Sequence, residues 1–146
     1  MRNSLLPLAA TVVLATATPA LAKTIVVKKN GPISTIADAV AMAGDGDKIV
    51  IKRGTYFETV TTDKNNLKFL GQRAIWDGTD AGGDETCLTL NGDNCVVQGI
   101  TFRNGTDQLI IEGDATTVRQ CRFRGSDGDA VIVRGQGALI DRIRSE

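Results

Sequence analysis

Short apolar runs separated by turn residues dominate the chain after its first segment. The β-branched run from Lys23 to Lys28 predicts a strand, and the sequence Asn30-Gly31-Pro32 breaks it. A second run, Lys48 to Lys52, carries Ile49 and Ile51 on one face and predicts another strand. From this point on, the pattern is that of strands and turns.

One short amphipathic helix is predicted between these two strands. Thr35 and Asp38 fit a capping box, in which a hydroxyl and a carboxylate accept hydrogen bonds from free amides. Gly44 is expected to supply the left-handed backbone position that ends the helix. Apolar side chains recur between them at helical spacing: Ile36, Val40 and Ala43.

The rest of the chain repeats itself at an offset of 21 or 22 residues. Several files of equivalent positions recur in each repeat, and they indicate two strands per turn. The expected files are Leu67, Leu88, Leu109 and Val131; Phe69, Leu90, Ile111 and Val133; Gly71, Gly92, Gly113 and Gly135; Trp76, Val97, Val118 and Ile140; Ile100, Cys121 and Ile143; and Phe102 with Phe123. The aromatic members of these files are predicted to be core residues and not platforms for sugars.

A repeat this short cannot bury its own apolar face, so equivalent residues must stack on the next turn. The sequence therefore predicts an all-β solenoid, a parallel β-helix with 21–22 residue coils, roughly four to five of them. The leucine-rich-repeat pattern is absent. The helix at residues 35–43 is expected to plug the N-terminal end of the solenoid, where open strand edges would invite aggregation.

Residues 1–22 read as a cleavable signal peptide, and residues 23–146 as the β-helix domain. Arg2 precedes an apolar centre from Leu5 to Ala17, and Ala20-Leu21-Ala22 supplies the small-residue ending. A membrane anchor is the alternative, but Pro7 and several threonines make the segment short and weakly apolar for a spanning helix. The expected location is secreted or periplasmic, with no membrane contact after cleavage.

Composition removes several function classes. The 17 basic and 17 acidic residues balance, which gives no general attraction to nucleic acid or membrane. The absence of histidine excludes Ser-His-Asp, Cys-His and His-metal chemistry. The three cysteines are expected to be small buried apolar residues, and Cys87 with Cys95 is the pair to test for a disulfide.

Three stretches of the sequence carry a resemblance to a known family: Thr35 to Val40, Gly46 to Glu58 and Asn66 to Gly71. They resemble the N-terminal cap and first coil of the pectin-lyase-like β-helix proteins, and Gly99 to Asn104 is similar to later coils. The resemblance implies a right-handed parallel β-helix with an N-terminal capping α-helix. Because that superfamily holds esterases, lyases, hydrolases and proteins without known activity, it implies little about function.

Among these enzymes the similarity is to pectin methylesterases, through Gly54 to Glu58 and Gln108 to Ile111. The second of these looks like that family's Gln-Ala-Val-Ala, so Gln108 is expected to help hold an oxyanion or substrate. The family's second glutamine is missing near Asp127 to Val131, and its two catalytic aspartates and arginine would belong to coils after Glu146.

Acidic turns supply a candidate metal site. Asp107, Asp127 and Asp129 precede equivalent strands, and stacked carboxylates are the ligands that calcium prefers. The alternative is that these aspartates cap ordinary turns.

A row of arginines supplies a candidate substrate surface. Arg103, Arg122 and Arg124 are expected to point outward on neighbouring coils, where they suit the carboxylates of an acidic polysaccharide. The alternative is a solvated face balanced by acidic neighbours.

The sequence thus predicts an exported β-helix that binds or processes acidic polysaccharide, as a lyase or pectinesterase-like enzyme. The alternatives are a non-catalytic structural or glycan-binding module, or a fragment of a longer or nonfunctional β-helix. Because the apolar files still run at Ile140 and Ile143 without a polar cap, the domain is expected to be C-terminally incomplete or to self-associate through that end.

Overall fold

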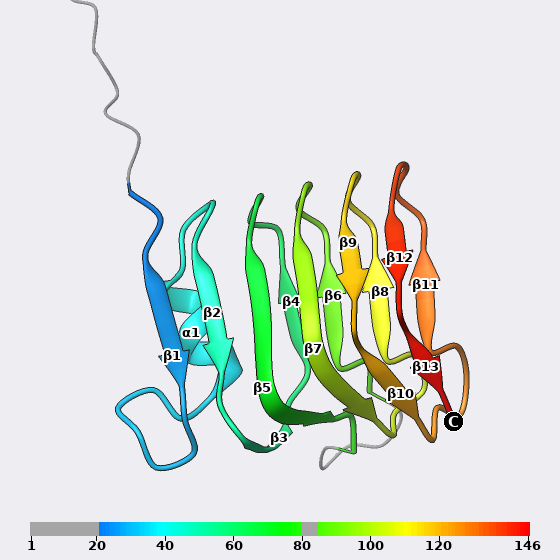
Figure 1. Cartoon of the computed structure of the whole chain (residues 1–146), viewed down its shortest axis with the longest axis horizontal. Coiled ribbons are helices and arrows are strands. Elements are labelled where there is room, and N and C mark those ends of the chain that lie inside the picture. Colours follow the sequence, from blue (N-terminus) through cyan, green and yellow to red (C-terminus); the bar gives the residue numbers. More distant parts are fainter. Residues whose placement is uncertain (1–20, 80–84) are drawn as a thin grey trace, which may run out of the picture.

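The computed structural model describes residues 21–79 and 85–146, and these form a right-handed parallel β-helix of about five turns (Figure 1). Every strand pairing in them is parallel. Strands of successive coils stack on one another along the axis of the solenoid, from its N-terminal to its C-terminal end, as the predicted fold requires. Residues 1–20 of the predicted signal peptide (1–22) lie outside the described residues. Among the described residues, no helix is long and apolar enough to span a membrane.

Two sheets form the walls. The smaller sheet contains β4 (Val60–Thr62), β6 (Leu88–Leu90), β8 (Leu109–Ile111) and β11 (Val131–Val133). The larger sheet has a main path of β1 (Thr24–Val27), β2 (Lys48–Ile51), β5 (Lys68–Asp77), β7 (Val96–Arg103), β10 (Arg122–Arg124) and β13 (Arg144–Ser145). Its side members are β3 (Gly54–Phe57), β9 (Thr117–Arg119) and β12 (Leu139–Asp141).

The larger sheet bends at a corner, so a coil has three strand segments where two were predicted. Residues with a left-handed backbone stand at this corner on successive coils: Arg73 (φ 57°), Gly99 (φ 70°), Gln120 (φ 54°) and Arg142 (φ 50°). Only Gly99 avoids the side-chain penalty of this conformation. In later coils the corner separates β9 from β10 and β12 from β13. We refer to it below as the left-handed corner.

The predicted register holds in the later coils and fails in the first. Leu88 pairs with Leu109 and Leu109 with Val131, and Phe102 pairs with Phe123, as expected. Val97 likewise pairs with Val118 and Val118 with Ile140.

The first step was wrong in the four files that begin before residue 80, because one coil is longer than the others. Phe69 lies beside Val97 and Trp76 beside Phe102, so these steps are 28 and 26 residues long. Two of the extra residues lie within β5, where the register shifts between Leu70 and Ala74, and the rest lie between β5 and β7. Leu88 instead pairs with Val60 on the other sheet. The constant offset of 21 residues had therefore matched residues of the larger sheet with residues of the smaller sheet.

The glycine file is confirmed from Gly92 onward. A Cβ on Gly113 would lie 2.1 Å from the carbonyl oxygen of Gly92, and one on Gly135 would lie 1.9 Å from that of Gly113. Gly71 does not belong to this file, because it lies against the backbone of Gly99 at the left-handed corner. The coils touch so closely at these glycines that no side chain fits.

Helix α1 (Ile36–Met42) covers the N-terminal end, as predicted, and packs on β1, β2 and β4 (Figure 1). Thr35 accepts a hydrogen bond from the Asp38 amide at 3.1 Å, which confirms the N-cap. The partner acid is a different one, however. Glu58 reaches across from the next coil and accepts from the amides of Ile36 (2.9 Å) and Ala37 (3.0 Å).

The predicted helix end at Gly44 was wrong in its geometry. Gly44 is not among the residues with positive φ, and the helix ends at Ala43 in an extended conformation. The Ala43 amide donates to the carbonyl oxygens of Ala39 and Val40, and the Gly44 amide donates to the Asp47 carboxylate at 2.7 Å. Hydrogen bonds from the Gly44 and Lys23 amides lower the pKa of Asp47.

An aromatic ladder fills the interior. Phe102 stacks on Phe123 with ring centroids 5.2 Å apart, Trp76 stacks on Phe102 at 5.7 Å, and Phe69 tilts against Trp76 at 6.1 Å. All four side chains are buried, which confirms their assignment to the core.

The three cysteines are free and buried, as expected, so the Cys87–Cys95 disulfide is absent. Burial raises the pKa of all three thiols, and that of Cys87 rises to about 12. These cysteines act as small core residues.

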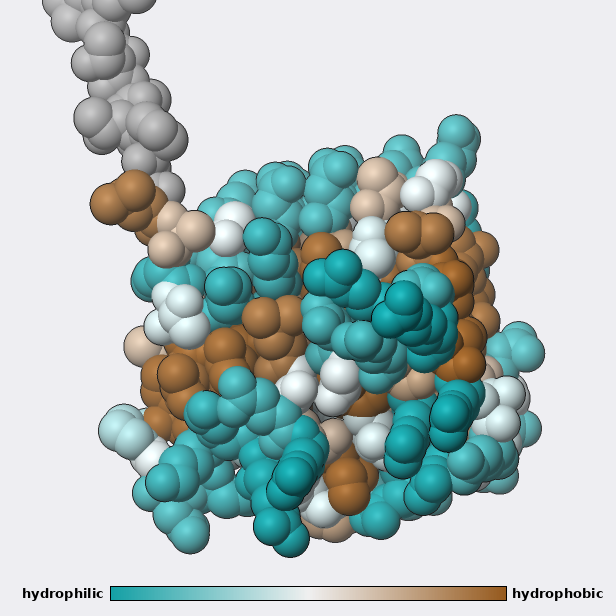
Figure 2. All heavy atoms as spheres, viewed as in Figure 1, coloured by the Kyte–Doolittle hydropathy of each residue, from teal (hydrophilic) through white to brown (hydrophobic). Residues whose placement is uncertain are grey.

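Exposed apolar side chains gather in the last two coils, at the C-terminal end of the solenoid. This end lies at the right in Figure 2. They are Val133, Leu139, Ile140 and Ile143. Self-association through this end stays a prediction.

Candidate ligand-binding corner

The acidic turns lie close together in sequence and form no metal cage. Asp107 uses one carboxylate oxygen to accept the backbone amide of Asp129 on the next coil, at 3.0 Å, and both Asp127 and Asp129 are exposed. Across residues 21–79 and 85–146 no three His, Cys, Asp or Glu side chains are grouped to hold a metal. The structure therefore gives the calcium prediction no preformed site.

The same device recurs at another corner of the solenoid, which explains why aspartates are frequent in the turns. Each of four side chains accepts the amide of the equivalent turn one coil further on, at 2.7–2.9 Å. They are Asp45, Asn65, Asp93 and Asp114. Capping is the role that the sequence left open as the alternative, although the amide capped belongs to the neighbouring coil and not to the local turn.

Gln108 is fully buried beside the start of β8. Its amide nitrogen donates to the carbonyl oxygens of Arg124 (2.6 Å) and Asn104 (3.2 Å), and so fastens two turns together. Its own carbonyl oxygen has no partner in the described part of the chain. Its amide nitrogen is therefore engaged within the fold and is not available to a ligand.

Arg103 is held by a buried acid. Its guanidinium contacts Asp77 through Nε at 2.7 Å and Nη2 at 2.6 Å, and Asp77 is only 1% exposed. Burial alone would raise the pKa of Asp77, but hydrogen bonds from Thr79, Asn104 and Arg103 outweigh it and lower the pKa. Arg103 therefore neutralises a core charge and is not free for a ligand.

The remaining predicted arginines divide. Arg124 forms an exposed ion pair with Glu146 at 2.8 Å. Arg122 stands directly beside Arg144 in the register of β10 and β13, and neither forms a salt bridge with any described residue. Like charges in adjacent strand positions repel each other, so this pair lacks the counter-charge that its neighbours have.

These two arginines line a small recess at the left-handed corner. It has a volume of about 230 Å³ and is lined by Gln120, Cys121, Arg122, Arg142 and Arg144. Arg142 approaches Asp141 at 3.6 Å, but no carboxylate lines the recess itself. We call this feature the arginine recess.

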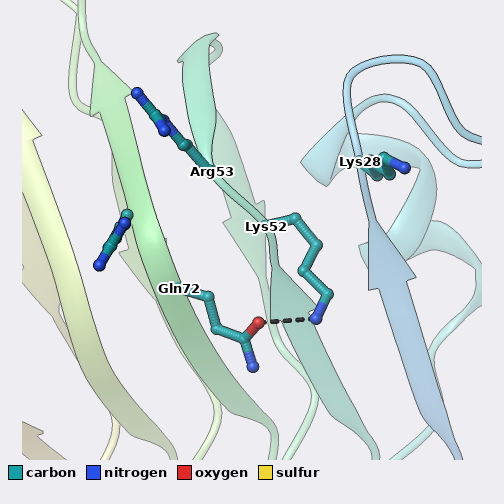
Figure 3. Close-up of a pocket in the computed structure, with 5 residues that line it drawn as sticks. Lys28, Lys52, Arg53 and Gln72 are labelled. Atoms are coloured by element: carbon teal, nitrogen blue, oxygen red, sulfur yellow. Dashed lines mark hydrogen bonds between the residues drawn. The ribbon is translucent and has the colours of Figure 1, made fainter.

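A second and larger recess, not predicted from the sequence, lies at the same corner near the N-terminal end (Figure 3). It has a volume of about 590 Å³ and is lined by Lys28, Lys52, Arg53, Gln72 and Arg73. Lys52 donates to the side-chain oxygen of Gln72 at 2.6 Å, as Figure 3 shows. We call this feature the lysine–arginine groove.

The groove brings together cations that lie 20 to 24 residues apart along the chain. Lys28 follows β1 and Lys52 follows β2, and the pairing of Gly54 with Ala74 sets Arg53 beside Arg73. None of these four cations forms a salt bridge within the described part of the chain. The basic residues that end successive strands were the available signal, but the variable length of the first coils concealed their alignment.

The chemistry that both recesses support is the binding of anions. Guanidinium groups pair with carboxylate or sulfate in a bidentate fork, and ammonium groups add charge without fixed geometry. The residues lining the two recesses include no carboxylate that could serve as a general acid or base.

Comparison with known proteins supports the fold. No family model matches the sequence, and no curated protein matches it. Among solved structures, the chain is similar to a pectin methylesterase mutant in complex with a hexasaccharide, with a TM-score of 0.58 and 21% sequence identity. The match covers 88% of this chain and 56% of that protein, so the chain spans little more than half of its length. The comparison thus supports the parallel β-helix fold that the sequence suggested.

Proposed function

We propose that this chain is an exported β-helix that binds an acidic polysaccharide at its left-handed corner. The observation that carries the proposal is the register of Arg122 and Arg144, which sets two guanidinium groups side by side, without a counter-ion, in the arginine recess. The two guanidinium groups repel each other in the free protein, and this repulsion decreases when carboxylates or sulfates bind between them. The shared fold with a pectin methylesterase solved with a hexasaccharide is consistent with a carbohydrate ligand.

Binding without turnover is the form of the proposal that the residues favour. Gln108 is buried and Arg103 is committed to Asp77, so two of the side chains considered for substrate contact hold the fold together. A lyase or esterase also needs a positioned base or nucleophile. Neither recess supplies one.

The test is calorimetric titration of the purified protein with polygalacturonate, and with dextran as the uncharged comparison. We expect binding to the acidic polymer alone, weakening as salt screens the charges. The double variant Arg122→Gln/Arg144→Gln should lose most of this affinity. The matched control Lys48→Gln/Lys68→Gln removes the same charge from paired positions at the opposite end of the strands and should bind normally.

Two outcomes would redirect the proposal. Equal binding of dextran and polygalacturonate would refute the electrostatic argument. Release of unsaturated sugars or methanol from pectin would show an enzyme, whose catalytic residues must then be sought outside the two recesses. Export is tested separately, by mass spectrometry of the protein recovered outside the cytoplasm, with cleavage expected after Ala22.

A further inference from the structure

The positive charges of the lysine–arginine groove are not neutralised by any described acidic residue. Lys28, Lys52, Arg53 and Arg73 come from three consecutive coils, and coils repeat at roughly the 4.8 Å spacing of strands. Four unit charges held this close repel one another even in the high dielectric of a surface. A bound anion removes this repulsion.

The groove and the arginine recess occupy the same corner. Arg73 lines the groove, Gln120 and Arg142 line the recess, and all three are left-handed corner residues on successive coils, with Gly99 between them. The strand order β5-β7-β10 separates Arg73 of the groove from Arg122 of the recess by two strand steps, or about 10 Å. They are therefore two parts of one edge of the solenoid.

Polar side chains lie on the surface between them. Gln98 pairs in register with Arg119, and the two side chains hydrogen-bond at 2.8 Å. The amide nitrogen of Gln98 also donates to Gln120 at 3.1 Å. These groups can contact the hydroxyls of a sugar chain that crosses from one recess to the other.

We propose that one linear acidic glycan lies along the left-handed corner and occupies the groove and the arginine recess together. This inference rests on the proposed function and adds to it a second binding site and a minimum ligand length. The ligand must carry anionic groups at least about 10 Å apart, which a single uronate cannot do. Occupying two linked sites raises affinity through effective concentration without a new kind of contact.

The experiment compares ligand lengths on four proteins. Galacturonate dimers, hexamers and polymer are titrated into the wild type, a groove variant (Arg53→Gln/Arg73→Gln), the recess variant (Arg122→Gln/Arg144→Gln) and the control (Lys48→Gln/Lys68→Gln). We expect the groove variant to lose about tenfold or more of the polymer affinity, while its binding of dimers at the recess persists. The control should keep the full gain in affinity with length.

The groove variant is expected to fold. Gln120 already adopts the left-handed conformation at the equivalent corner position, so glutamine is tolerated where Arg73 stands. A second variant, Lys28→Gln/Lys52→Gln, tests the same groove without changing a left-handed residue. Its polymer affinity should fall in the same direction.

The possible failures are distinguishable. If the wild type binds no acidic glycan, both the proposed function and this inference fail. If the polymer binds and both groove variants retain wild-type affinity, the inference is overturned while the proposed function stands. Sulfated and uronate polymers of equal length distinguish the two anions, and equal binding of polyphosphate would overturn the assignment to a glycan.

Discussion

Asp77→Ala tests the ion pair between Asp77 and Arg103, whose carboxylate is the most buried among the ion pairs of the described residues. The Asp77 carboxylate accepts hydrogen bonds from Arg103, from Asn104 at 3.1 and 3.2 Å, and from Thr79 through its hydroxyl at 2.6 Å and its amide at 3.0 Å. The substitution removes all of them from a site that joins the ends of β5 and β7. It also leaves the arginine without its counter-ion.

The expected loss of stability depends on whether water can replace Asp77 as the partner of each donor. Breaking a buried ion pair costs about 3–5 kcal/mol when the remaining charge stays buried. The Arg103 side chain is 40% exposed, so water can replace its partner, which favours the lower end. Thr79 is exposed and Asn104 is half-buried, so water can partly replace their lost partner, and each donor loses at most about 1 kcal/mol. We expect the free energy of unfolding to fall by ~3 kcal/mol and the melting temperature by about 10 °C.

Urea denaturation followed by circular dichroism measures this loss. Arg124→Ala is the matched control on the adjacent coil, because its exposed pair with Glu146 should contribute less than about 1 kcal/mol. The pKa of Asp77 is lowered from 3.8, so its stabilising effect is present above that pH and lost as the pH falls through the folded-state pKa. The wild type and Asp77→Ala should therefore converge in acid. A loss below 1 kcal/mol at neutral pH would refute the reasoning.

Other contacts give equally direct expectations. Gly113→Ala should destabilise by more than ~2 kcal/mol because its Cβ would meet the Gly92 carbonyl at 2.1 Å, whereas Gly44→Ala, with nothing nearer than 3.8 Å, should change stability by less than ~0.5 kcal/mol in the same denaturation assay. Glu58→Ala should cost about 1 kcal/mol by removing the acid that caps α1; an unchanged unfolding curve would contradict this. Cys87 and the other two thiols should resist a disulfide reagent until the protein unfolds, since burial raises their pKa values; rapid labelling of the native state would show that they are accessible.

The later coils could be predicted because their length is nearly constant. Leu88, Leu109 and Val131 stack as the 21–22 residue offset required, and so do Phe102 and Phe123. The first steps failed where an insertion made one coil longer. Hydrophobic periodicity tells which residues face inward, but residues of either sheet satisfy it equally well.

The candidate site was only partly predictable, because a side chain's partner lies on another coil. Arg103 and Gln108 have the sequence character of ligand-binding residues, yet Asp77 and two carbonyl oxygens occupy them. Arg122 remains free only because its register neighbour is Arg144. Nothing in the sequence indicated the partners of Arg103 and Gln108, whereas the 22-residue offset already predicted Arg144 beside Arg122.

The sequence by itself determined the repeat, the capping helix and the inward files, because each depends on residues close in the chain or on a constant spacing. Only the tertiary structure decided which charged side chains are neutralised. The corner where Arg53 meets Arg73 and Arg122 meets Arg144 exists because parallel strands from successive coils align in register. Whether a cation is neutralised or left for a ligand depends on that alignment, since electrostatic interactions are set by distance and burial and not by separation along the chain.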